Sequence, residues 1–313
     1  MTAAGMSHRT GISLTELFAR FPDDAAAERF FVESRWPDGI ACPRCGSVNV
    51  QEKTTHKTMP FRCRDCRRFF SVRVGTAMAD SKLGYRTWAI AVYLVTTSLK
   101  GVSSMKLHRD LGVTQKTAWH LAHRIRQAWT DDGGGPLGGP VEVDETYVGG
   151  LAKNRHASER DRPHRRSDFE KTPVVGVKDR ATGEVRARVV TATDGDTLRG
   201  FVRENAAPGS QVYSDGHAAY TSLEGEYKHA AVQHSVGTYV IGQAHTNGIE
   251  SFWSMMKRGY IGTYHWMSAK HLDRYVDEFS GRHNQRPMDT ADQMRRVARG
   301  LVGKRLQYGE LTA

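Results

Sequence analysis

The cysteines of this chain limit the fold of its first quarter more than any other feature does. They form two C-x2-C pairs, "CPRC" and "CRDC", separated by 17 residues, and the chain contains no other cysteine. Each pair turns tightly enough to direct both sulfurs at one metal ion, and the spacing is typical of a four-thiolate zinc site. Four reduced thiols in an ordinary core would not produce two matched pairs. The predicted zinc ligands are Cys42, Cys45, Cys63 and Cys66.

The charge of the chain indicates the class of its partner. It has 45 Lys and Arg residues against 34 Asp and Glu residues, a formal net charge of +11. A chain this basic attracts polyanions, of which nucleic acids are the commonest.

The zinc is predicted to be structural, because no His or carboxylate pattern beside it gives the open three-ligand site that catalysis requires. Arginines surround the second cysteine pair, so we expect contacts to DNA phosphates from Arg64, Arg67 and Arg68.

Nothing in the sequence predicts a membrane partner. The chain has no run of 18 apolar residues, and its N-terminus lacks the apolar core of an export signal. The cysteines lie in one segment and do not form a disulfide framework spread over the chain, which fits a reducing compartment. We therefore expect a cytoplasmic protein that is associated with the nucleoid when it is bound to DNA.

Composition and periodicity divide the chain into segments of a mixed α/β (α+β) protein. After the glycine-rich linker, strands and helices follow in the order β-β-β-α-β-α-α, with a polar, basic loop between the first two strands. The predicted segments are an N-terminal helical segment (1–40), broken at Pro22, a zinc ribbon (41–75), a helical region (82–130), a flexible linker (131–140), a mixed α/β domain (141–285), and a C-terminal helix with a loose end (286–313).

The helical region before the linker has the pattern of a helix-turn-helix. A short helix ends near Asp110, Gly112 supplies the turn, and Thr114 caps a second helix. A structural helical hairpin is the alternative. The outer face of the second helix would enter the major groove with Gln115, Lys116, His120, His123 and Arg124.

Three carboxylates are candidates for one acidic cluster. Asp144 ends a predicted strand in "VEVDETYVGG", Asp215 ends another in "VYSDGHAAY", and Glu250 lies on a helix in "HTNGIESFWSMMKRG". Carboxylates held together repel each other and need cations, and oxygen ligands suit Mg²⁺ or Mn²⁺. Such ions serve phosphoryl transfer. Lys257 lies seven residues after Glu250, on the same helix face, although such a pair is more often a solvated surface.

These motifs together resemble a known family. "CPRCGS", "FRCRDC", "VEVDETYVGG", "VVGVKDR", "VYSDGHAAY" and "HTNGIESFWSMMKRG" span most of the chain. The chain resembles bacterial insertion-sequence transposases of the DDE type, and more narrowly the IS1595 group with an N-terminal zinc ribbon. The resemblance implies a ribonuclease-H-like catalytic domain over residues 141–285. It also implies a homo-oligomer that binds the terminal inverted repeats and target DNA.

The resemblance also implies roles for the acidic residues. Asp144, Asp215 and Glu250 would hold Mg²⁺ or Mn²⁺, and Lys257 would reach a phosphate or a base of the DNA end. Some members of the group are read with Asn as the third ligand, so Asn247 is the alternative to Glu250. Glu142 and Glu145 flank Asp144. Glu142 shares the strand face of Asp144 and could tune the site, but a surface role is the simpler interpretation.

The expected function is therefore that of a transposase, which cleaves DNA at the ends of its element and joins the freed 3′-hydroxyl to target DNA. One alternative is a non-catalytic DNA-binding regulator descended from a transposase. The other is a plain nuclease of the same fold. The three intact carboxylates argue against the regulator.

Overall fold

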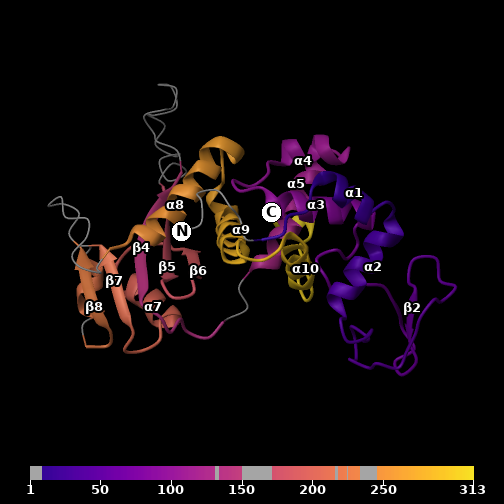
Figure 1. Ribbon diagram of the computed structural model, residues 1–313, viewed down its shortest axis with the longest axis horizontal. Helices are drawn as coiled ribbons and strands as arrows, with labels where there is room; N and C mark the ends of the chain where they lie inside the picture. The colour runs from indigo at the N-terminus through magenta and orange to yellow at the C-terminus, as the bar shows by residue number, and fades with distance from the viewer. Residues whose placement is uncertain (1–8, 131–133, 150–170, 216–217, 224, 233–244) are drawn as a thin grey trace. The chain divides into compact units, whose positions relative to one another are not determined.

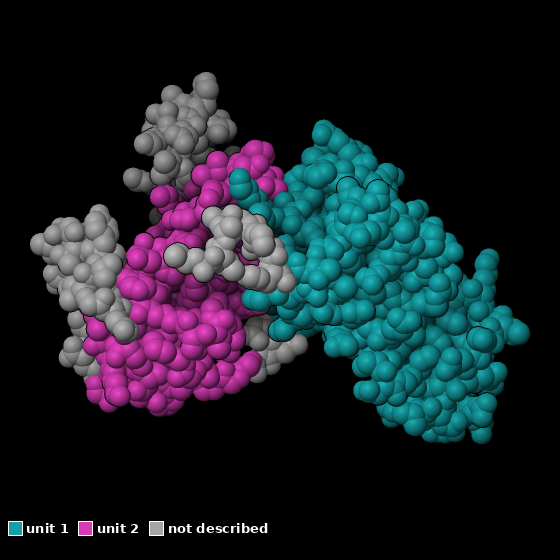
Figure 2. Space-filling model, viewed as in Figure 1, with its two compact units in different colours: residues 1–130, 287–313 teal, residues 131–286 magenta. Residues whose placement is uncertain are grey.

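The computed structural model describes residues 9–130, 134–149, 171–215, 218–223, 225–232 and 245–313. The chain divides into two compact units, residues 1–130 with 287–313 and residues 131–286 (Figure 2). The predicted basic loop between the first two strands of the second unit falls within residues 150–170, which lie outside the described residues. Among the helices that the structure describes, none is both long enough and apolar enough to cross a membrane.

Helices make up most of the first unit (Figure 1). Pro22 separates the first two helices as predicted, and the side chains of Ser13 and Asp23 accept backbone N–H groups at their starts. The helices pack around one core that includes the fully buried Trp88 and Ile125. The elements are α1 (Leu14–Arg20), α2 (Asp24–Arg35), α3 (Tyr85–Thr97), α4 (Ser104–Leu111), α5 (Gln115–Arg126), η1 (Gln127–Trp129), α10 (Thr290–Gly300) and α11 (Tyr308–Thr312).

The C-terminal segment belongs to this first unit. The sequence predicted one helix and a loose end, whereas two helices form and α10 contacts α2 and α3. Met294, Val297 and Leu301 recur at helical spacing and are buried in the core that α3 and α5 share. Leu311 in α11 is fully buried as well. The end of the chain is therefore packed against the first unit.

The four-cysteine segment forms a small antiparallel sheet of β1 (Val50–Gln51), β2 (Phe61–Cys63) and β3 (Phe69–Phe70). Its core consists of little more than two cysteines and two phenylalanines, with the ring of Trp36 edge-on to both phenylalanines. So small a core rarely holds a fold by itself, so a cross-link such as a metal ion is expected here.

A mixed five-stranded sheet forms the centre of the second unit (Figure 1), which confirms the mixed α/β class. The strand order is β6-β5-β4-β7-β8; β4 pairs antiparallel with β5 and parallel with β7. The strands are β4 (Val141–Val148), β5 (Thr172–Asp179), β6 (Val185–Val189), β7 (Gln211–Asp215) and β8 (Lys228–Val232). β5 and β6 form an antiparallel hairpin. The sequence missed β8, because "KHAAV" is short and has little apolar alternation.

Helices cover both faces of this sheet. Val141 and Val143 pack with residues of α7 on one face, and Val148 packs with residues of α8 and α9 on the other. Side chains alternate between the faces along a strand, so Glu142 and Asp144 lie on the side of α8 and α9. The helical elements are α7 (Gly195–Asn205), η5 (Ala218–Leu223), α8 (Asn247–Gly259), the π-helix η7 (Tyr260–Tyr264), η8 (Ala269–His271) and α9 (Leu272–Gln285).

The predicted flexible linker is attached to this second unit over its described part. Leu137 is buried, its N–H donates to the carbonyl of Asn205 at 2.7 Å, and its own carbonyl accepts from Ala207 at 2.9 Å. Glycine and proline predicted flexibility here, but Leu137 anchors the stretch to the end of α7, and Arg186 donates to the carbonyls of Gly134 and Gly135. Residues 131–133 lie outside the described residues.

Candidate active site and metal centres

Two aspartates lie side by side on neighbouring parallel strands. β4 pairs with β7 in a register that joins Val143 to Ser214, so Asp144 and Asp215 are the next residues in line. Asp215 ends β7 as predicted, but Asp144 does not end β4, which continues for four residues to Val148 along its pairing with β5. The parallel register explains how residues 71 positions apart in the chain reach one place.

Glu145 joins the two aspartates. Carboxylate oxygens of Asp144, Glu145 and Asp215 all lie within 4.8 Å of one another. The buried hydroxyl of Tyr220 donates to Glu145 Oε2 at 3.0 Å and holds this side chain in place. Burial, and then the charges of Asp215 and Glu145, raise the pKa of Asp144 to about 8. The cluster therefore resists full ionisation unless a cation is bound.

Glu250 stands in the first turn of α8, outside the group of described carboxylates whose oxygens lie within 4.8 Å. Its charge nevertheless adds to the raised pKa of Asp144, after burial and the charges of Asp215 and Glu145. The hydroxyl of Thr246 donates to Glu250 Oε1 at 2.6 Å. Asn247 is the exposed first residue of α8, and Lys257 is exposed two turns after Glu250. The apolar stripe of Ile249, Phe252, Trp253 and Met256 is buried as predicted.

Glu142 is buried, and the expectation of a surface role for it is wrong. Its side chain is 2% exposed, and Arg180 Nε donates to its Oε1 at 2.7 Å. Its Oε2 accepts the backbone N–H of Ile249, in the first turn of α8, at 2.9 Å. The strand pattern could not reveal this, because Arg180 lies 38 residues away in the turn after β5.

The chemistry of the donor set suits a hard divalent cation. Asp144, Glu145, Asp215 and Glu250 offer carboxylate oxygens only, which fits Mg²⁺ or Mn²⁺ better than zinc. Burial is the main cause of the raised pKa of Asp144, and a cation would offset the repulsion from Asp215 and Glu145 that adds to it.

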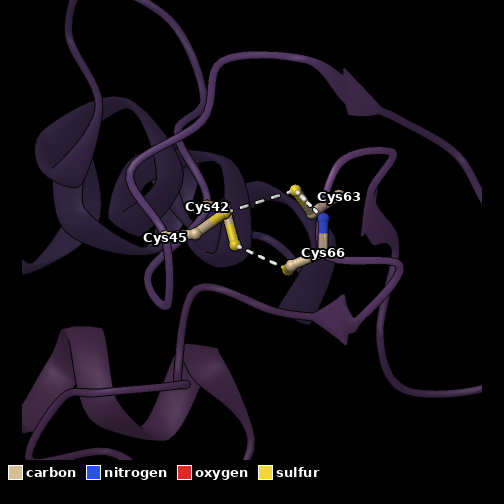
Figure 3. A group of neighbouring side chains, drawn as sticks. All are labelled: Cys42, Cys45, Cys63 and Cys66. Carbon is tan, nitrogen blue, oxygen red and sulfur yellow. Dashed lines mark hydrogen bonds between the residues drawn. The ribbon is translucent and has the colours of Figure 1, made fainter.

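The four cysteines converge as the sequence predicted (Figure 3). Cys42 Sγ lies 3.7 Å from Cys66 Sγ, and Cys45 Sγ lies 3.7 Å from Cys63 Sγ. With zinc–sulfur bonds of about 2.3 Å, a tetrahedral site has sulfur–sulfur edges of about 3.8 Å, so this spacing fits zinc. The backbone N–H of Cys66 lowers the pKa of Cys63 to about 7, whereas the neighbouring thiols raise the pKa of Cys45, so without a metal ion the cluster does not hold four thiolates.

Comparison with known proteins shows the family of this chain. The family model of the ISXO2-like transposase domain matches residues 136–284, and that of the transposase zinc-ribbon domain matches residues 22–68. A protein of Halobacterium salinarum, described as an uncharacterized protein in transposable element ISH50, is 30% identical over 272 residues, 83% of this chain and 90% of the relative. This chain belongs to the IS1595-type transposases. An uncharacterized transposase-like protein of Haemophilus influenzae is 30% identical over 97 residues, 31% of this chain and 77% of the relative.

The zinc ribbon of the transposase carries its arginines on the surface. Arg64, Arg67 and Arg68 are all exposed beside the second cysteine pair. The zinc-ribbon family and the cysteine geometry together support a structural zinc ion in this segment.

The second helix of the predicted helix-turn-helix is only partly available. Gly112 adopts the left-handed conformation (φ 64°) between α4 and α5, and Thr114 caps α5. Gln115 and Lys116 are exposed, but Lys116 Nζ lies 4.3 Å from the ring centre of Tyr308 in α11. His120 Nε2 is 3.1 Å from the carbonyl oxygen of Leu306. The C-terminal segment thus covers part of the face that was predicted to enter a groove.

Two residues predicted on that face are buried. His123 is fully buried, and Arg124 donates to the carbonyl of Ala79 with its guanidinium over the ring of Trp88. Placing Arg124 and His123 on the outer face was wrong, because α5 packs against the rest of the unit on more than one side. A long charged side chain can bury its apolar stem, and the sequence alone does not show whether it does so.

Sequence reasoning missed or undervalued three residues of the second unit. Glu145 had one available signal, its position directly after Asp144. Arg180 had none. Gly176 lies in the motif "VVGVKDR", and a Cβ atom there would approach the ring of Trp253 to 2.7 Å, so the glycine lets α8 lie close on β5.

Proposed function

We propose that this transposase has a ribonuclease-H-like catalytic domain of the DDE type, which cleaves DNA at the ends of its element and joins them to target DNA. The supporting observation is the crowding of Asp144 and Asp215 on adjacent parallel strands, with the raised pKa of Asp144. Acidic groups pressed together on two inner strands of a sheet are costly unless they hold cations. The coarser conclusion, membership in a transposase family, stands on the comparisons.

In this proposal Asp144, Asp215 and Glu250 hold Mg²⁺ or Mn²⁺, and Glu145 adds a fourth carboxylate. The bound ions would supply charge stabilisation for phosphoryl transfer and an activated water or hydroxyl oxygen. Lys257, two turns along α8, would reach a phosphate or a base of the DNA end. The side chains position the reacting groups and do not form a covalent bond with DNA.

The first unit would recognise DNA in this proposal. Arg64, Arg67 and Arg68 on the ribbon would contact phosphates, and Gln115 and Lys116 at the start of α5 would reach base edges of the terminal inverted repeats. Because two element ends must be cut together, we expect a homo-oligomer on DNA, associated with the nucleoid.

A strand-transfer assay tests the function. Purified protein would be combined with Mg²⁺, labelled element ends from the DNA that flanks its gene, and a target plasmid. The matched proteins carry Glu250→Gln, Glu145→Gln and Asn247→Ala. We expect joined product from the wild type, none from Glu250→Gln, a reduced amount from Glu145→Gln, and nearly normal product from Asn247→Ala.

Each other outcome has a distinct meaning. Loss with Asn247→Ala but not with Glu250→Gln would make Asn247 the third ligand. Cleavage without joining would identify a plain nuclease. Tight, specific binding of the ends with neither cleavage nor joining would identify a regulator descended from a transposase.

A further inference from the structure

A buried ion pair lies next to the carboxylate cluster and has no part in the chemistry proposed above. Glu142 precedes Asp144 by two residues on the same face of β4, and Arg180 Nε is 2.7 Å from its Oε1. The side chains are 2% and 19% exposed. A buried ion pair is a poor source of stability compared with apolar residues of similar size. Its presence at this place therefore calls for another explanation.

Glu142 caps a helix to which it does not belong. Its Oε2 accepts the N–H of Ile249 at 2.9 Å, one of the first-turn N–H groups that lack a partner within α8. A carboxylate at this end of a helix is also favoured by the helix dipole. Gly248 lies so close to the carboxylate that a Cβ atom there would be 2.6 Å from Oε2. The start of α8 is therefore fixed against β4.

This external cap leaves the residue at the N-cap position for another task. Thr246 makes no side-chain capping hydrogen bond to α8. Its hydroxyl instead donates to Glu250 Oε1 at 2.6 Å. Glu142 thus makes the capping hydrogen bond that the side chain at an N-cap position usually makes. The hydroxyl of Thr246 orients the carboxylate of Glu250 instead.

Arg180 extends the same network to a third element. One guanidinium nitrogen donates to the carbonyl of His245, just before α8, and the guanidinium lies 3.9 Å from the ring centre of Tyr213. Tyr213 is on β7, two residues before Asp215 and on the same face. The pair therefore contacts β4, β7 and the start of α8, the elements that carry Asp144, Asp215 and Glu250.

We infer that Glu142 and Arg180 are positioning residues, which set the place of Glu250 relative to Asp144 and Asp215 and so determine the affinity of the site for divalent cations. The inference rests on the proposed function. Partners behind metal ligands typically change metal affinity or activity by about 10–100-fold when they are removed. A pair that served only stability would change the melting temperature and leave cation affinity intact in the folded protein.

The test compares Glu142→Gln and Arg180→Lys with the wild type. Glu142→Gln keeps the shape but not the charge, and Arg180→Lys keeps the charge but not the fork of donors. Mn²⁺ binding is measured by titration calorimetry without DNA, beside single-turnover cleavage, binding of element ends and thermal unfolding. We expect about 10–100-fold weaker Mn²⁺ binding and slower cleavage, with end binding unchanged. Glu226→Gln is the matched control, because it breaks the half-exposed ion pair with Arg203 in the same unit.

A double variant separates positioning from folding. Glu142→Leu with Arg180→Met replaces the pair by apolar residues, which is often neutral or stabilising. We expect this double variant to fold but to bind Mn²⁺ more weakly than the wild type, because Glu142 no longer caps α8. Mn²⁺ affinity within twofold of the wild type in this folded variant overturns the inference.

The outcomes also separate this inference from the proposed function. A wild type that binds Mn²⁺ at Asp144 but cuts no DNA refutes the proposed function, and the Mn²⁺ affinities of the variants still decide the inference. If the wild type shows no Mn²⁺ binding that the Asp144→Asn substitution removes, both the inference and the proposed function are overturned.

Discussion

The cysteine cluster and the carboxylate cluster of this transposase are assembled in different ways. The four cysteines lie within 25 consecutive residues, and two short turns bring their sulfurs to 3.7 Å, close to the spacing that zinc requires. The clustered carboxylates come from β4 and β7, where Asp144 and Asp215 are 71 positions apart, and Glu250 of α8 follows Asp144 by 106 positions. The first cluster depends on local turns, and the second depends on the packing of the whole unit.

The two clusters also differ in how the absence of a metal ion affects the stability of the fold around them. Thiols can stay protonated and neutral, but their segment has almost no core without a central ion. The carboxylates sit in a well-packed unit, where burial and like charges raise the pKa of Asp144 to about 8. We therefore expect zinc to hold the fold of its segment, and a divalent cation to relieve repulsion in a unit that is already folded.

The largest expected effect is the loss of the ribbon when zinc is removed. Structural zinc contributes about 10–16 kcal/mol in isolated zinc fingers, more than this small core can replace. Cys63→Ser, or a strong chelator, should unfold residues 41–75 and abolish specific binding of element ends. Amide hydrogen exchange with zinc analysis checks this, and the amides of β4 and β7 should keep their protection. Unchanged protection of the ribbon amides in zinc-free protein would contradict the comparison.

A smaller effect of opposite sign is expected for Asp144→Asn. Unfolded Asp144 titrates near its ordinary value of 3.8 and folded Asp144 near 8, so the folded, cation-free protein binds more protons between these values. Its stability therefore falls as pH rises from about 3.8 to 8, and asparagine removes that loss. We expect Asp144→Asn to raise the free energy of unfolding by about 1–4 kcal/mol at pH 7 while it abolishes cleavage.

Chemical denaturation without divalent cations at pH 5 and pH 8 measures this effect. Asp196→Asn is the control, because Asp196 is almost fully exposed and its ion pair with Arg199 is worth little. A loss of stability in Asp144→Asn at pH 8 would show that the cluster is not under electrostatic repulsion.

The difference in assembly also explains what the sequence could predict. Cysteine spacing identified all four ligands, because the geometry is local. Strand patterns found Asp144 and Asp215, and the parallel pairing of β4 with β7 brings these two residues together. Glu145 was visible only as a neighbour of Asp144, and the buried role of Glu142 depended on Arg180 and on the first turn of α8. No local pattern reports a partner that tertiary packing supplies.

The same limit applied to the first unit. Turn and cap residues correctly placed the end of α4 and the start of α5, because Gly112 and Thr114 act locally. The buried and exposed faces of α5 could not be assigned from the sequence. The segment that includes α11 lies almost 200 residues later in the chain and covers part of one face. Burial of Arg124 followed from contacts to Ala79 and Trp88 that the helical period does not encode.

The packing that assembles the carboxylate cluster can be disturbed at Gly176. A Cβ atom at this position of β5 would lie 2.7 Å from the buried ring of Trp253 in α8. Overpacking of this kind costs about 1–3 kcal/mol, so Gly176→Ala should destabilise the unit and also weaken Mn²⁺ binding by displacing Glu250. Gly200→Ala in α7 is the matched control, because nothing lies within 4 Å of its added Cβ atom. Alanine there should stabilise by up to about 1 kcal/mol.

The smallest expected effect is a loss of stability in acid, which affects both the zinc ribbon and the unit that contains the carboxylate cluster. Burial, and then the charges of Arg286 and Lys178, lower the pKa of His283 in α9 from 6.5 to about 4. The unfolded chain therefore binds a proton that the folded chain refuses, and stability is lost as pH falls from about 6.5 to 4. His283→Gln should flatten this loss by about 1 kcal/mol, a figure reduced because the ring is partly exposed to solvent.

Acid also protonates zinc-bound thiolates, so a global unfolding curve would mix the two causes. Amide exchange resolves them, because protection in α9 reports on His283 and protection in β2 reports on the ribbon. His283→Gln should retain more protection than the wild type in α9 at pH 5 and should leave β2 unchanged. The exposed His56 of the ribbon, changed to Gln, is the control and should alter neither pH dependence in α9 nor cation binding. Equal acid sensitivity of α9 in the wild type and His283→Gln would assign the acid response of the catalytic unit to other groups.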